Sequence, residues 1–169
     1  MTGGWRLTVP ALALTAWLAA ALLTAAVVAP AAFAALPSRA LAGEVVGRVL
    51  PVVFVAGMLV GLAVAAMLGT GAGAGRTVPA VTALCVSAAC AVSHFLVDPK
   101  IARLRVEIGV PVDALPVDDA RRVAFGLLHG YSVGGLGVAM LAGTLSLGFV
   151  LHLATRSDAR REPPEPSPR

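Results

Sequence analysis

Residues 98–122 read DPKIARLRVEIGVPVDALPVDDARR, and long apolar runs lie on both sides of this stretch. An apolar run of about 20 residues crosses the hydrocarbon core of a bilayer as a helix. The flanking runs are of that length, so we expect them to lie in a membrane. The stretch between them, which we call the polar island, must then lie at an aqueous boundary.

The composition supports a membrane protein. Of the 169 residues, 58% are hydrophobic and 13% are charged, and the mean hydropathy is +0.88, far from the averages of soluble globular domains. The net charge of +4 comes from residues in the connections and tails rather than from one face, which argues against nucleic acid as a partner. The lipid bilayer is the expected partner, with basic ends near anionic headgroups.

Four apolar spans are predicted, at about 7–35, 45–68, 78–97 and 123–154. The fold class is therefore all-α: a polytopic integral membrane protein, expected in the cell membrane, with four transmembrane helices in a bundle. Residues 1–155 form this domain, and the Arg- and Pro-rich tail 156–169 is predicted to be disordered. The first apolar run exceeds the h-region of a secretory signal, so we expect it to be retained.

Four spans place both termini on one side of the membrane. The basic residues are nearly balanced between the two sides, with six on the terminal side and seven on the island side. The positive-inside rule therefore does not assign an orientation.

The polar island has predicted internal structure. Asp98 is placed to cap a helix whose first residue is Pro99. Ile101, Leu104 and Ile108 then fall on one face, which predicts a short amphipathic interfacial helix between the third and fourth spans. Asp118 or Asp119 can cap the fourth span, because a negative charge is favourable at a helix N-terminus.

Glycines at four-residue spacing indicate surfaces on which helices pack. Gly126, Gly130 and Gly134 lie one turn apart in the fourth span, and Gly57 and Gly61 form a similar pair in the second. Small residues at this spacing let a neighbouring helix approach closely. They are predicted packing faces, through which a homo- or hetero-oligomer could also form.

Polar side chains at membrane depth are few. His129 and Ser132 lie three residues apart in the fourth span, and His94 ends the third span, so the two histidines can lie at a similar depth. Interhelical hydrogen bonding is the first interpretation, without a cofactor. The alternative is a haem or a transition metal held by His94 and His129. The candidate functional residues are His94, Asp98, Pro99, His129, Gly130 and Ser132.

The middle turns of the four spans contain no Asp, Glu, Lys or Arg. Such residues mark proton relays and substrate routes in membranes, so a proton-coupled pump is disfavoured. No nucleophile and base with a third orienting group can be recognised. We therefore predict that the protein is not an enzyme.

The chain resembles the transmembrane protein 205 family and its bacterial relatives of unknown function. The resemblance covers most of the chain and depends on the order and spacing of short motifs. These are Trp17, Phe33 with Leu36-Pro37, Leu50-Pro51 with Phe54, Pro99 with the helix after it, and Phe125 with His129-Gly130-Tyr131-Ser132. The resemblance implies a four-helix membrane protein of no settled biochemical activity, associated with metal-drug resistance in the eukaryotic branch. It implies no catalytic residue.

The sequence thus predicts a small multi-pass membrane protein that acts at its island side by binding a ligand or a partner. A protein that binds or handles haem or metal through His94 and His129 is the alternative. An enzyme of lipid metabolism ranks third.

Overall fold

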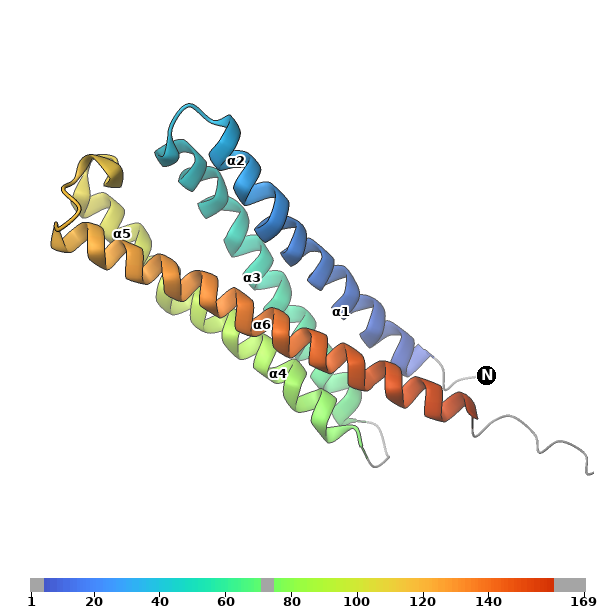
Figure 1. The fold of residues 1–169 in the computed structure, drawn as a ribbon. Helices are drawn as coiled ribbons and strands as arrows, with labels where there is room; N and C mark the ends of the chain where they lie inside the picture. Colours follow the sequence, from blue (N-terminus) through green and yellow to red (C-terminus); the bar gives the residue numbers. More distant parts are fainter. Residues whose placement is uncertain (1–4, 71–74, 160–169) are drawn as a thin grey trace, which may run out of the picture.

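The computed structural model describes residues 5–70 and 75–159, and all regular structure in these residues is helical. Four helices are long and apolar enough to cross a membrane: Trp5–Ala35, Arg39–Gly69, Thr77–Ile108 and Ala120–Ser157. They run antiparallel in chain order, and the two ends of the described chain lie together, opposite the polar island (Figure 1). The predicted all-α, four-span bundle is confirmed.

The first and third spans are each built from three helical segments. The first consists of α1 (Trp5–Leu23), the π-helical turn η1 (Thr24–Val28) and α2 (Ala29–Ala35). The third consists of α4 (Thr77–Val92), the π-helical turn η2 (Ser93–Val97) and α5 (Asp98–Ile108). A proline, Pro30 or Pro99, comes two residues after each π turn. Proline has no N–H and its ring presses on the carbonyl four residues earlier, and a widened turn relieves this conflict.

The second and fourth spans are the single helices α3 (Arg39–Gly69) and α6 (Ala120–Ala159). Between α5 and α6 the polar island contains a short 3-10 helix, η3 (Val112–Ala114). The Ser38 hydroxyl caps α3 by accepting a hydrogen bond from the Leu41 N–H. Asp119 caps α6 as predicted, because its Oδ1 accepts the Arg121 N–H at 2.8 Å.

The structure corrects the predicted start of the island helix. Asp98 does not cap it: its φ of −56° and ψ of −44° are helical, and its N–H donates to the Ser93 carbonyl. The helix continues the third span without a break, so Thr77–Ile108 is one helix of 32 residues. At 1.5 Å per residue it is about 48 Å long, more than the roughly 30 Å of the hydrocarbon core. Its α5 end therefore extends past the apolar layer.

The predicted tail and the loop between α3 and α4 lie partly outside the described residues. The helix α6 continues to Ala159, so the first residues of the predicted disordered tail are helical. The rest of that tail, 160–169, and residues 71–74 of the glycine-rich loop after α3 are not among the described residues.

The core lies where the four spans meet around Trp17. The packing order is a closed ring in which α1 contacts α3, α3 contacts α4, α4 contacts α6 and α6 contacts α1. The Trp17 indole N–H donates to the Val53 carbonyl at 3.0 Å, and Trp17 packs with Phe54 and Val86 in one buried cluster. This hydrogen bond satisfies a polar group that would otherwise be buried without a partner.

The two helical hairpins bury equivalent positions, so the bundle has an internal repeat. Between the first and third spans, buried residues correspond at a constant difference of 69 in residue number: Pro10 with Pro79, Leu14 with Ala83, Trp17 with Val86, Ala21 with Cys90, and Thr24 with Ser93. Between α3 and α6 the difference is 82: Phe54 with Leu136, Gly57 with Ala139, Gly61 with Gly143, Val64 with Ser146, and Leu68 with Val150. The ring of helix contacts has the same two-fold pattern, in which α1 corresponds to α4 and α3 to α6.

Candidate functional site

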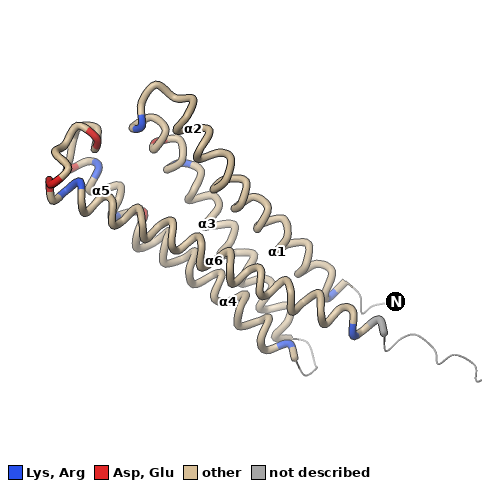
Figure 2. The backbone as a smooth tube through the Cα atoms, in the orientation of Figure 1, with Lys and Arg blue, Asp and Glu red and all other residues tan. Residues whose placement is uncertain are grey.

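Charged residues are found toward the two ends of the bundle, and an apolar middle separates them (Figure 2). At the island end, Arg39 Nε lies 3.5 Å from Asp113 Oδ2 and so joins the start of α3 to η3. Glu44 and Arg48, one turn apart, form an ion pair in the first turns of α3. All four side chains are more than half exposed, so each pair contributes at most about 1 kcal/mol to stability.

Asp119 and Arg121 fix the start of α6. The Arg121 guanidinium donates to both carboxylate oxygens of Asp119, at 2.8 and 3.1 Å, and the Arg121 N–H donates to Asp119 Oδ1. The side-chain hydrogen bonds from Arg121, followed by the backbone one, lower the pKa of Asp119 to about 2. The carboxylate is therefore the charged helix cap expected at a positive helix end.

Arg105 connects three helices at the island end. Its Nη2 donates to the Gly43 carbonyl of α3 at 3.3 Å, and its guanidinium carbon lies 5.4 Å from the centre of the Phe125 ring of α6. A Cβ at Gly43 or at Gly47 would lie 3.3 Å from the guanidinium. Our sequence analysis missed this contact, although the Gly43–Gly47 spacing signals a close approach there.

His94 and Asp98 form a polar pair at the junction of η2 and α5. His94 Nδ1 lies 3.6 Å from Asp98 Oδ2, and the side chains are 28% and 22% exposed. These two atoms are buried and neither has a hydrogen-bond partner. Next to the pair, the buried Ser93 packs against Gly135 of α6, where a Cβ would collide with the Ser93 hydroxyl. The site is thus a partly buried polar pair next to a tightly packed contact between η2 and α6.

The other predicted polar residues lie apart from this pair. His129 and Gly130 are exposed on α6, whereas Ser132 is buried. The polar neighbour of His94 is Asp98. In the described part of the chain no group of three or more His, Cys, Asp or Glu side chains could hold a metal ion. The haem or metal alternative thus stays a prediction with two candidate protein ligands.

The predicted glycine faces divide into two classes. A Cβ at Gly57 would lie 2.6 Å from Trp17 Nε1, and one at Gly61 would lie 2.5 Å from the Ala83 carbonyl oxygen, so this pair packs inside the bundle as predicted. By contrast, Gly126, Gly130 and Gly134 have no atom within 4 Å of such a Cβ. The glycines of α6 that do pack inside, Gly135 and Gly143, were missed.

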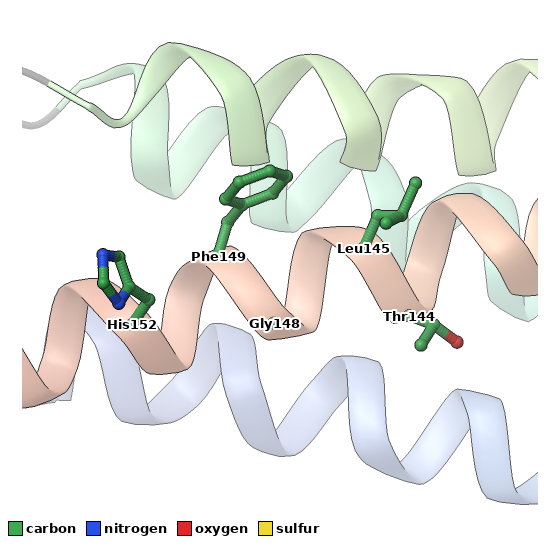
Figure 3. A pocket seen from close by; sticks show the side chains of 5 residues that line it. All are labelled: Thr144, Leu145, Gly148, Phe149 and His152. Carbon is green, nitrogen blue, oxygen red and sulfur yellow. The ribbon is translucent and has the colours of Figure 1, made fainter.

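A shallow hollow lies on the outward face of α6 near its C-terminal end (Figure 3). It measures about 300 Å³ and is lined by Thr144, Leu145, Gly148, Phe149 and His152. Gly148 also has no atom within 4 Å of a hypothetical Cβ. The hollow therefore continues the row of unoccupied glycines along α6.

No curated protein and no solved structure gives a significant match to the chain. A family model described as a domain of unknown function, DUF4149, matches residues 12–109. The matched residues include Trp17, the His94–Asp98 pair and Arg105, and α6 lies outside the match. Because the match covers more than half of the sequence, the chain belongs to the DUF4149 family.

Proposed function

We propose that this protein acts by binding rather than by catalysis, and that α6 provides the surface for a second transmembrane helix, beginning in its island-side half. The observation that carries the proposal is the row of exposed α6 positions Gly130, Gly134, Gly137, Leu141, Thr144 and Gly148, which we call the outward glycine face. None of its four glycines has an atom within 4 Å of a hypothetical Cβ.

The spacing of the outward glycine face suits a helix partner. Its members follow one another by four, three, four, three and four residues, the alternation that keeps one seam of a helix turned toward a second helix. Small residues on such a seam let the two backbones approach, and close packing drives helix association in lipid.

Exposure to lipid alone does not account for these glycines. In α3, 82 residues earlier, the positions equivalent to the four glycines carry Arg48, Val52, Val55 and Ala66, and Val52 is 68% exposed. Glycine inside a helix costs roughly 1 kcal/mol relative to alanine. A face that met only lipid could carry residues other than glycine, as these α3 positions do, and would avoid that cost.

The first partner we propose is a second copy of the chain. Copies labelled with donor and acceptor fluorophores and reconstituted in vesicles should show energy transfer that falls as lipid dilutes the protein. Replacing Gly134 and Gly137 by Leu should weaken association about tenfold, or about 1.4 kcal/mol. Val52→Leu on the equivalent face of α3 is the matched control and should leave association unchanged. Absence of transfer in the wild type, or equal transfer in the double-leucine variant, would contradict self-association.

Two finer assignments belong to this proposal. Within the DUF4149 family we place the chain with the transmembrane protein 205 relatives, and the motif order from Trp17 to Ser132 supports this. The cell membrane is the expected location.

The haem or metal alternative through His94 and His129 is tested by the absorption spectrum and the metal content of the purified protein. A Soret band in the wild type that is lost in His129→Ala would favour this alternative over our proposal.

A further inference from the structure

The two π turns are equivalent in position but differ in the side chains they carry. Each begins with a buried hydroxyl residue, Thr24 or Ser93, and each is followed by a proline. At the positions of His94 and Asp98, 69 residues earlier, the first span has Ala25 and Ala29. The first span therefore forms the equivalent π turn without ionisable residues. The His94–Asp98 pair is thus not needed to form such a turn.

Placing the ionisable side chains of His94 and Asp98 at this turn costs folding free energy. Ionisable side chains near the membrane interior are expensive and mark functional sites by default. Here the facing atoms, His94 Nδ1 and Asp98 Oδ2, are buried and lack hydrogen-bond partners. An unpaired charge at either atom would be destabilising, whereas opposite or absent charges on both would be tolerated.

No neighbouring helix supplies a second counter-charge to the pair. The helices in contact with η2 are α3, α4, α5 and α6. Between Arg48 and the end of α3 there is no ionisable residue, and Glu44 and Arg48 pair with each other. The Cys90 thiol lies one turn earlier in α4, and Arg105 contacts Gly43 and Phe125. The other ionisable groups described in these helices form no ion pair with His94 or Asp98; they are Arg39, Cys85, Lys100, Arg103, Glu107, Arg121, Arg122, His129, Tyr131, His152 and Arg156.

We propose that His94 and Asp98 together bind one proton, and that this proton keeps the η2 turn closed at its junction with α5. The proton lies either on His94, giving an imidazolium and a carboxylate, or on Asp98, giving an imidazole and a carboxylic acid. Either form is neutral overall, and moving the proton between the residues interconverts them, so the pair titrates as a unit. When a second proton binds, His94 is an imidazolium beside a neutral carboxylic acid. When the one proton is lost, Asp98 is a carboxylate beside a neutral imidazole. Each outcome leaves an uncompensated charge in the partly buried η2–α5 junction.

Amide hydrogen exchange tests this in the full chain in lipid nanodiscs. The exchange rate of residues 93–97 is divided by that of residues 24–28, the equivalent turn without ionisable groups, which removes the intrinsic pH dependence of exchange. In the wild type the ratio should be lowest at intermediate pH and rise about tenfold toward acid and toward alkaline pH, because an unpaired, partly buried charge destabilises the closed turn.

Single variants should respond to pH with opposite signs. In His94→Ala the remaining carboxyl is neutral only when protonated, so the turn should be protected in acid and open as the pH rises. In Asp98→Ala the remaining imidazole is neutral only when deprotonated, so the turn should open as the pH falls. Similar slopes in the two variants would overturn the proposal.

The double variant His94→Ala/Asp98→Ala is the matched control, because it restores the alanines of the first turn. It should fold, protect residues 93–97 and lose the pH dependence of the ratio. A double variant that keeps the wild-type pH profile would show that other groups hold the proton. One that loses protection at every pH would show that the pair is structural. Either result overturns the proposal.

Discussion

Gly61 and Gly134 are both helical glycines, but Gly61 packs closely against a neighbouring helix and Gly134 does not. A Cβ at Gly61 would lie 2.5 Å from the Ala83 carbonyl oxygen, a backbone atom that moves only if α4 moves, whereas Gly134 has nothing within 4 Å. Gly61→Ala should therefore lower the free energy of unfolding by about 1–3 kcal/mol through overpacking. Gly134→Ala should leave it unchanged or raise it by up to about 1 kcal/mol.

Denaturant unfolding in detergent, at a dilution where the protein is monomeric, compares the two alanine variants directly. Equal loss of stability in both would show that α3 and α4 are not as close as the structure has them.

Residue spacing predicted which glycines form faces, but not which of those faces are buried. Gly57–Gly61 and Gly126–Gly134 have the same pattern in the sequence. In a membrane the lipid-facing and interior-facing positions are both apolar, so hydropathy does not separate them. The His94–Asp98 spacing was also visible, but the sequence favoured a helix cap at Asp98, and only the packed helices show that the facing atoms of the pair are buried.

At the scale of single elements, the start of α6 depends on the charge of Asp119. Its pKa is lowered to about 2, below the roughly 3.9 of an unfolded aspartate. A lowered pKa means that the cap contributes its full stability above the unfolded value and loses it as the pH falls from about 4 toward 2.

An NMR titration of the Arg121 N–H should report this cap with a midpoint near 2. Asp119→Asn should abolish the titration while keeping a helix cap, because asparagine also accepts the N–H bond. Asp118→Asn should leave it unchanged. A midpoint near 4 in the wild type would mean that the Asp119–Arg121 contact does not persist in solution.

The number of spans followed from apolar length, but some helix ends did not. The Asp98-Pro99 pair is typical of a helix start, because proline is well tolerated at the first helical position. Here Pro99 instead continues a helix, and the π turn before it absorbs the conflict with the backbone. The equivalent turn before Pro30 shows that this is a property of the spans and not of the polar island.

For the whole molecule, the internal repeat leaves short identical or nearly identical motifs in the sequence, which were not noticed there. Residues 8–11 and 77–80 both read TVPA, and MLVG at 58–61 corresponds to MLAG at 140–143, whereas in the core Trp17 corresponds to Val86 and Leu14 to Ala83. Because a lipid-embedded core is satisfied by many apolar side chains of complementary size, buried position is retained while identity changes. The comparison of burial between the hairpins therefore extends the repeat from these short motifs to the whole core.

The same arrangement predicts the topology of the whole chain. Ser38 lies between the first and second spans and Ala114 between the third and fourth, and both are exposed at the island end. Thr77 is exposed at the opposite end. In a background with Cys85→Ala and Cys90→Ala, single cysteines at Ser38 and at Ala114 should react with an impermeant thiol reagent from the same side of sealed vesicles. A cysteine at Thr77 should react only from the other side. The background should fold, because alanine already occupies the equivalent buried position, Ala21. Labelling of Ser38 and Ala114 from opposite sides would require an odd number of crossings between them, which two antiparallel hairpins cannot provide.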